Sequence, residues 1–530
     1  MFVHTHDVGG GWALIDANDK RRARHAVLDH VKALLERRFA APERGAPGGR
    51  IASSITEEVT VMSTTLTRGA ALAALLLGLS GPALADAERL EADLRALFAD
   101  TPGELSIGEV SDSLLGGSTT AEDLVFVGDN GDRLRLDRYT VEGDYDRPDE
   151  VVMEGLRLEA QNDEPGVISA ERLVVGEPSR PLLALHDLPL DGELAAAELT
   201  IDGLAMSRET PRTRVEGGKE VFLGTATGRL TIEHLYATEL SRQAIGRLEM
   251  TGIRGSGEQL EDIGDGHFSL ASISLAGLRG LDREQEERTL ERLELSDLSI
   301  EAERLVATLE RLRLDGDMTD GGGGMWLESL ELDLARMVEL APENEQTQLR
   351  MASNVLTGGS GRLTVDAAFD GEWQTVGPES LLTGESRITA GDAFRWTIDT
   401  ELPVRLPEGV EPSTYLAEMN SLEGVTLLGG EIETTLTELG LFGRMPAVMA
   451  ASRGVSEADF LAQARTQAKG FGTMLGAEFG AILDGVVDMM EGKASELVIH
   501  LSLPAETGMD KLADDPLMLP SKLSMRVETH

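Results

Sequence analysis

A six-residue phrase, apolar-x-apolar-x-Gly-apolar, recurs along the middle of this 530-residue chain and constrains its fold more than any other feature. Copies start at residues 151, 199, 230, 248, 273 and 293, and a partial copy starts at 312. Alternating apolar residues predict β-strands with one apolar face, and the Glu, Thr, Asp and Ser between them predict a solvated opposite face. The phrase therefore predicts a long sheet that is apolar on one side, most simply an antiparallel one.

The glycine of the phrase predicts a bend. Strict alternation would place the sixth residue on the polar face of the sheet. A β-bulge or bend at the glycine would return that residue to the apolar face. His234 and Asp297 replace the glycine in two copies, and both residue types are enriched among non-glycine residues with positive φ.

A leucine-rich repeat is the alternative to this sheet. Residues 290–295 and 309–314 both read Leu-x-x-Leu-x-Leu and start 19 residues apart. The Asn typical of that repeat is replaced by Leu298 or Asp317, and the other copies lack the first leucine. We expect a long curved antiparallel or solenoid-like sheet rather than a leucine-rich horseshoe.

The pattern divides residues 86–530 into three parts. Residues 86–103 predict an N-terminal helix, because Leu90, Leu94, Leu97 and Phe98 share one helical face. Residues 104–405 predict a β-rich repeat domain, with a Gly-rich turn at 358–361 and strands continuing over 341–402. Pro403, Pro407 and Pro412 predict its boundary.

Residues 406–530 predict a helical hairpin with two terminal strands, so the overall class is mainly β, α+β. Ser456 and Asp459 resemble a helix capping box. Gly472, Gly476 and Gly480 recur every four residues, a spacing that lets another backbone approach closely. The two strands are expected at 496–503 and 522–527.

The N-terminal region carries the pattern of a secretory signal peptide at residues 62–85. Arg68 precedes an apolar run over 69–79, and Ala83-Leu84-Ala85 is typical of a cleavage site. We expect Met62 to be the true start and residues 1–61 to be a disordered leader translated from upstream DNA, although a basic helix over 20–39 is an alternative. Cleavage would leave no transmembrane anchor and a periplasmic protein.

Charge restricts the partners. The chain has 93 acidic and 48 basic residues, no cysteine and a net charge of −45. This balance argues against nucleic acid, because phosphate binding needs clustered Lys and Arg. The acidic surface predicts adaptation to salt, and docking of a basic partner is the alternative. The sequence leaves the oligomeric state open.

No pattern of catalytic, cofactor-binding or metal-binding residues stands out, so we assign no such residue and expect a non-enzymatic protein without a cofactor. The histidines are not at metal-ligand spacing, and no nucleophile elbow or P-loop is present. Residues 315–320 resemble part of a calcium loop, but Trp326 occupies the place of its closing Glu.

The export signal and the repeated strands at roughly 150–340 resemble the bacterial envelope proteins of the AsmA-like type. That resemblance implies a long curved sheet whose apolar inner face handles lipid, although a cleavable signal differs from the membrane anchor of that family. Three functions stay open: a structural or scaffolding protein of the cell envelope, which we expect first; a carrier of lipid or another hydrophobic ligand; and a hydrolase without a recognisable motif. An envelope lipid or envelope protein is the expected partner.

Overall fold

The structure, a computed structural model, describes two short segments, 2–4 and 12–14, and residues 86–530 with gaps at 100, 114–116, 162–164, 183–194, 217–218, 261–263, 283–287, 304, 317–320, 377–378, 407–424 and 509–522. The chain divides into two compact units, one over Ile55–Trp373 with Glu411–Met419, the other over Gln374–Val410 and Asn420–His530 with Met1–Ser54. The predicted signal peptide at 62–85 and the alternative helix at 20–39 lie outside the described residues. Within residues 1–61, β1 (Phe2–His4) pairs antiparallel with β2 (Trp12–Leu14).

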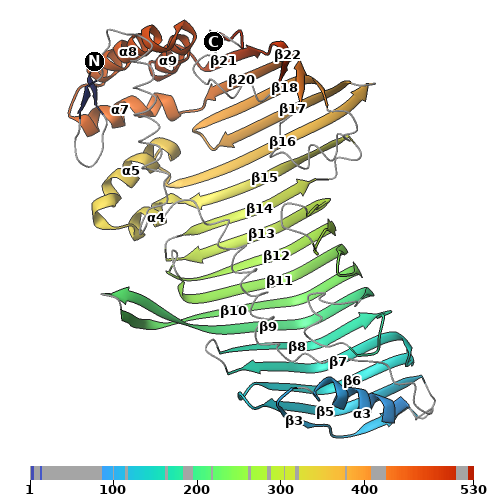
Figure 1. Ribbon diagram of the computed structural model, residues 1–530. Helices are drawn as coiled ribbons and strands as arrows, with labels where there is room; N and C mark the ends of the chain where they lie inside the picture. Colours follow the sequence, from blue (N-terminus) through green and yellow to red (C-terminus); the bar gives the residue numbers. More distant parts are fainter. Residues whose placement is uncertain are drawn as a thin grey trace. The chain divides into compact units, whose positions relative to one another are not determined.

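The first unit is an antiparallel sheet in which successive strands are neighbours (Figure 1). Its strands are β3 (Gly103–Ser106), β4 (Val110–Asp112), β5 (Ser118–Gly128), β6 (Arg133–Asp144), β7 (Arg147–Ala160), β8 (Gly166–Gly176), β9 (Ala196–Glu216), β10 (Lys219–Leu240), β11 (Ala244–Leu260), β12 (Gly264–Arg279), β13 (Arg292–Ala302), β14 (Val306–Asp315), β15 (Gly322–Asp333) and β16 (Arg362–Val376). The predicted mainly-β, antiparallel class is confirmed. The two Leu-x-x-Leu-x-Leu segments lie on β13 and β14, which run antiparallel, whereas a leucine-rich repeat would pair them in parallel.

A line of residues with positive φ bends every second strand of this sheet. Its members lie on β5, β7, β9, β11, β13 and β15: Asp123, Gly155, Gly203, Gly252, Asp297 and Ser329. The residues on either side of Gly252 keep one-to-one pairing, since Thr251 pairs with Ser272 and Ile253 with Leu270. The bend therefore keeps the apolar residues on one face without a shift of register there, as the phrase predicts.

The prediction for His234 is wrong, because this residue is not in the positive-φ region. His234 lies on β10, whose neighbours β9 and β11 supply the bending residues Gly203 and Gly252. The bend needs a positive-φ residue on alternate strands only, so β10 keeps extended backbone at this place. The sequence phrase alone does not distinguish the two kinds of strand.

Helix α3 (Asp86–Leu97) packs against β4 and β5 at the start of the sheet. Leu90 and Leu94 are buried, and the ring of Phe98 stacks on Phe126 at 4.8 Å. The Tyr145 hydroxyl donates to Asp93 at 2.9 Å. The predicted helical face is thereby confirmed, and the helix ends six residues before the expected limit at 103 because Pro102 and Gly103 stop it.

The strands expected over 341–402 begin later than predicted. Helices α4 (Leu334–Leu340) and α5 (Glu343–Thr357) come first, and strands follow from β16 onward. Helix α5 is rich in Glu, Gln, Leu and Met, which are good helix formers, and follows Pro342. It ends at Gly358 in the left-handed region, within the predicted turn at 358–361.

The second unit combines a sheet with three described helices. Its strands are β17 (Glu379–Ala390), β18 (Phe394–Arg405), β19 (Thr426–Leu428), β20 (Glu431–Glu438), β21 (Glu496–Ser502), β22 (Ala505–Gly508) and β23 (Arg526–Thr529). Its helices are α7 (Leu441–Arg453), α8 (Glu457–Leu475) and α9 (Ala477–Met490). The division after Trp373 lies before the prolines that predicted a boundary, because Pro403 pairs with Leu381 inside the β17–β18 ladder.

Helices α8 and α9 form the predicted hairpin, and glycine makes their contact close. The Ser456 hydroxyl accepts a hydrogen bond from the Asp459 amide at 3.1 Å and begins α8. Gly476 connects the helices, and a Cβ built on Gly472 would lie 2.8 Å from the Cα of Gly480. The hairpin is joined by α7, and the terminal strand begins at Arg526 rather than at 522.

The bend in the sheet gives the first prediction. Gly252→Ala should lower the free energy of unfolding by about 1–2 kcal/mol, because φ is +63° there and L-residues are strained in the left-handed region. Gly228→Ala is the matched control, since a Cβ there meets no atom within 4 Å, and it should change stability by less than about 0.5 kcal/mol. Urea unfolding midpoints measure both; equal effects would contradict the bend.

The helix contact gives the second prediction. Gly472→Ala should destabilise the protein by about 1–3 kcal/mol, because its methyl group overlaps the backbone of α9. Gly470→Ala lies on the same helix with open space around the new Cβ and should stabilise by about 0.5–1 kcal/mol through helix propensity. Thermal unfolding followed by circular dichroism distinguishes the two, and stabilisation by both substitutions would refute close packing at Gly472.

Candidate functional site

Apolar side chains cover one face of the first unit in four ladders of residues that are paired, or lie next to each other, across the strands. We call this surface the apolar face. Ladder 1 contains Val151, Val175, Leu199, Ala237, Leu248, Leu275, Leu293, Leu314 and Met325. Ladder 2 contains Met153, Leu173, Ile201, Leu235, Met250, Ile273, Leu295, Leu312 and Leu327.

The other two ladders lie beyond the bend. Ladder 3 contains Leu156, Ala170, Leu204, Ile232, Ile253, Leu270, Leu298, Leu309 and Leu330. Ladder 4 contains Leu158, Ile168, Met206, Leu230, Gly255, Phe268, Ile300, Ala307 and Leu332. Side chains from ladders 2, 3 and 4 pack together around Ile232, Ile253 and Leu270, which shows that the bend leaves these ladders on one side of the sheet.

Burial changes along the apolar face. From β7 to β10 all residues of ladder 1 belong to one buried cluster, which also includes apolar residues of β5 and β6 and Leu90 and Leu94 of α3. From β11 to β15, ladders 1 and 2 are only partly buried, as at Met250, Ile273 and Leu295, and Met325 is 38 % exposed. The described residues therefore close the apolar face at its first strands and leave it partly accessible at its later strands.

The opposite face of the sheet carries cross-strand charge pairs. Arg138 lies between Glu122 and Glu154, with N–O distances of 3.0 and 3.1 Å. Further along, His234 Nδ1 lies 2.7 Å from Asp202. Side-chain hydrogen bonds to Glu122 raise the pKa of Arg138. The arrangement spaces opposite charges along a wet surface and so accommodates part of the acidic excess.

A pocket of about 840 Å³ is lined by residues at the ends of β7, β8, β11, β12 and β13 and by residues within β9 and β10. Strands β9 and β10 continue past it as a long hairpin (Figure 1). A small-residue row crosses it from strand to strand and consists of Ala160, Gly166, Gly228, Gly257, Gly266 and Ala302. Arg208 interrupts that row, paired with Gly166 on one side and Gly228 on the other. Arg336 of α4 also lines the pocket.

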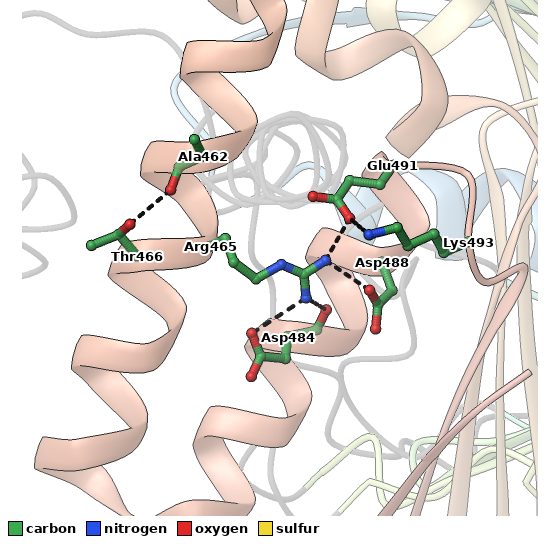
Figure 2. Close-up of polar contacts among 7 residues, drawn as sticks. All are labelled: Ala462, Arg465, Thr466, Asp484, Asp488, Glu491 and Lys493. Atoms are coloured by element: carbon green, nitrogen blue, oxygen red, sulfur yellow. Dashed lines mark hydrogen bonds and ion pairs between the residues drawn. The ribbon is translucent and has the colours of Figure 1, made fainter.

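A second polar cluster joins α8 to α9 in the other unit (Figure 2). Arg465 contacts Asp488 at 2.7 Å, Glu491 at 2.6 Å and Asp484 at 3.4 Å, and Lys493 pairs with the same Glu491. The hydrogen bond to Asp488 raises the pKa of Arg465, whereas hydrogen bonds first from Lys493 and then from Arg465 lower the pKa of Glu491. These groups satisfy one another, so the cluster serves to hold the hairpin.

The histidines remain dispersed, as their sequence spacing indicates. His234, His267, His500 and His530 each lie beside a different carboxylate. Within the part of the chain that the structure describes, no group of three or more His, Asp or Glu side chains could hold a metal ion. Asp315 of the calcium-like segment pairs with Arg292 and Arg313, and residues 317–320 lie outside the described ranges.

The pocket at the strand ends contains no residue that the sequence pattern marks as a site residue. One signal was available: Met206-Ser-Arg208 continues the alternation of β9 and places a cation where the repeat places apolar residues. The glycines of neighbouring strands gave no such signal, because they meet only through the pairing register.

No family model matches the chain, and no curated protein matches its sequence. The site must therefore be argued from its own geometry. Among the helices described, none is both long enough and apolar enough to cross a membrane.

The Arg465 cluster yields a pH-dependent prediction. The lowered pKa of Glu491 means that its ion pairs stabilise the fold above its ordinary pKa of 4.5 and are lost as the pH falls through the folded value. Glu491→Gln should therefore lower the free energy of unfolding at pH 7 by up to about 1 kcal/mol, and the deficit should shrink at pH 3. Urea unfolding at both pH values measures it.

Glu431→Gln is the control for this experiment. Glu431 pairs with Glu401 across β18 and β20, so its neutralisation removes a like-charge contact and should not destabilise the protein at pH 7. An equal loss in both variants would show that Glu491 acts through net charge rather than through Arg465.

Proposed function

We propose that this protein is a non-enzymatic carrier that binds the hydrocarbon chain of a lipid or similar amphiphile on the apolar face. The observation that carries this proposal is the partial exposure of ladders 1 and 2 from β11 to β15. A continuous apolar surface, even one that is only partly exposed, often marks a place where a protein binds a partner or a ligand. A hydrocarbon chain would remove that surface from water, and the hydrophobic effect would stabilise the complex.

The order of the ladders suits an extended chain. Consecutive ladder residues lie on neighbouring strands, which are spaced by about 4.8 Å. An acyl chain could lie across several strands and contact one ladder residue after another, for example Met250, Ile273 and Leu295. A face built from aliphatic side chains would hold it without directional bonds, so chains of different length would bind.

The compartment belongs to the same proposal. The segment at 62–85 supports export to the bacterial periplasm, and the AsmA-like resemblance at roughly 150–340 supports a lipid ligand. A protein with 93 acidic and 48 basic residues would remain soluble in salt while its apolar face holds the ligand.

A structural role in the cell envelope is the second candidate. The cross-strand charge pairs around Arg138 would let the polar face hold its shape or contact an envelope protein. Native mass spectrometry of the protein purified without detergent separates the two functions: co-purifying lipid supports the carrier, and a protein partner without lipid supports the scaffold.

A matched pair of variants tests the apolar face. Ile273→Gln should weaken binding of a fluorescent fatty acid about tenfold, which corresponds to 1.4 kcal/mol, because it puts an amide in the middle of ladder 2. Ser274→Gln is the control: it introduces the same glutamine side chain at the next residue of β12, which lies on the polar face. It should leave binding unchanged. Fluorescence titration measures both, and equal weakening would place the ligand elsewhere.

A further inference from the structure

The pocket at the strand ends lies directly beyond the apolar face. Along β9, Met206 belongs to ladder 4 and Arg208 follows two residues later, so alternation puts both on the same side of the sheet. The same step leads from Leu230 to Gly228 on β10 and from Phe268 to Gly266 on β12. The small-residue row and Arg208 thus continue the surface that the ladders form.

The charged side chains around this pocket lie on different faces of the sheet, because successive residues of a strand point to opposite faces. Three glutamates line the pocket: Glu209, Glu258 and Glu301. Each is one residue away, along its own strand, from a member of the row that contains Arg208. Their side chains therefore belong to the polar face, and the same holds for Asp265 and for the exposed Arg229, which also line the pocket. Arg208 is half-buried and lies on the apolar-face side.

Space is available beside Arg208. Its cross-strand partner Gly228 has no atom within 4 Å of the position a Cβ would occupy. Arg336 lines the same pocket and brings a second guanidinium, which lies 3.4 Å from Glu339. A guanidinium donates paired hydrogen bonds to phosphate or carboxylate oxygens. Because the row consists of glycine and alanine, such an anionic group can approach the backbone.

We propose that this pocket binds the anionic head group of a lipid whose chain lies on the apolar face, with Arg208 as the principal contact. This proposal rests on the proposed function and adds two points to it. The ligand is an anionic amphiphile, and its head group lies at the pocket formed by β7 to β13. The head group is that of a lipid rather than a free anion, because the pocket is one alternation step from ladder 4 on each of these strands.

Two probes with the same chain separate the head-group site from the apolar face. Dodecanol and dodecyl phosphate both carry a twelve-carbon chain, and only the second carries an anion. The wild-type full chain should bind dodecyl phosphate about tenfold more tightly than dodecanol by isothermal titration calorimetry at fixed ionic strength. Arg208→Gln should remove this preference and leave dodecanol binding unchanged.

Arg172→Gln is the matched control, because it removes the same charge from the polar face of β8, the strand next to β9, at a residue that is not among those lining the pocket. It should leave both affinities as in the wild type. Gly228→Leu is an independent variant that keeps Arg208 and fills the space beside it, and it should weaken dodecyl phosphate selectively. Circular dichroism confirms that each variant is folded.

The outcomes distinguish the two proposals. If dodecanol does not bind the wild type, the carrier function fails. If dodecanol binds but dodecyl phosphate binds no more tightly, or if Arg208→Gln and Arg172→Gln act alike, the head-group site is overturned while the carrier stands. Competition by inorganic phosphate at the same concentration as dodecyl phosphate would also overturn it, since the site would then recognise a free anion.

Discussion

Cross-strand pairing of alternating apolar residues is the interaction on which the first unit depends. Each strand contributes few large side chains, and each ladder residue meets partners on both neighbouring strands. A single sheet built this way has only one apolar side to bury, unlike a sandwich, in which two sheets cover each other. Its stability and the proposed ligand binding therefore depend on the same surface.

The line of bends makes that surface wide enough to be useful. Without a positive-φ residue on alternate strands, Ile253 would lie on the opposite face from Met250. The apolar face would then be limited to ladders 1 and 2. Because Gly203 and Gly252 bend the strands, ladders 3 and 4 join the same side, and the pocket beyond ladder 4 becomes continuous with it. A backbone conformation thus determines the extent of the apolar face.

Much of this fold could be predicted from the sequence, since the six-residue phrase encodes both the strand period and the bend. The phrase could not reveal which strands carry the bend, because this depends on neighbours, as His234 between Gly203 and Gly252 shows. The strands expected from residue 341 turned out to begin only after α5, where local helix propensity exceeded the β pattern. The pocket was invisible for another reason: Gly166, Arg208, Gly228 and Gly257 lie far apart in the chain and meet only through register.

Alternation also resolves the conflict between a strongly acidic chain and an anionic ligand. A net charge of −45 would repel such a ligand if the charge were spread evenly around the sheet. On β9 to β13 the carboxylates near the pocket belong to the polar face. The repulsion from more distant carboxylates is screened by salt, because the screening length is about 10 Å at 0.1 M ionic strength. Arg208 acts at contact distance on the other face, where screening is weak. One arginine in the right register can therefore govern head-group selection even in a protein with nearly twice as many acidic as basic residues.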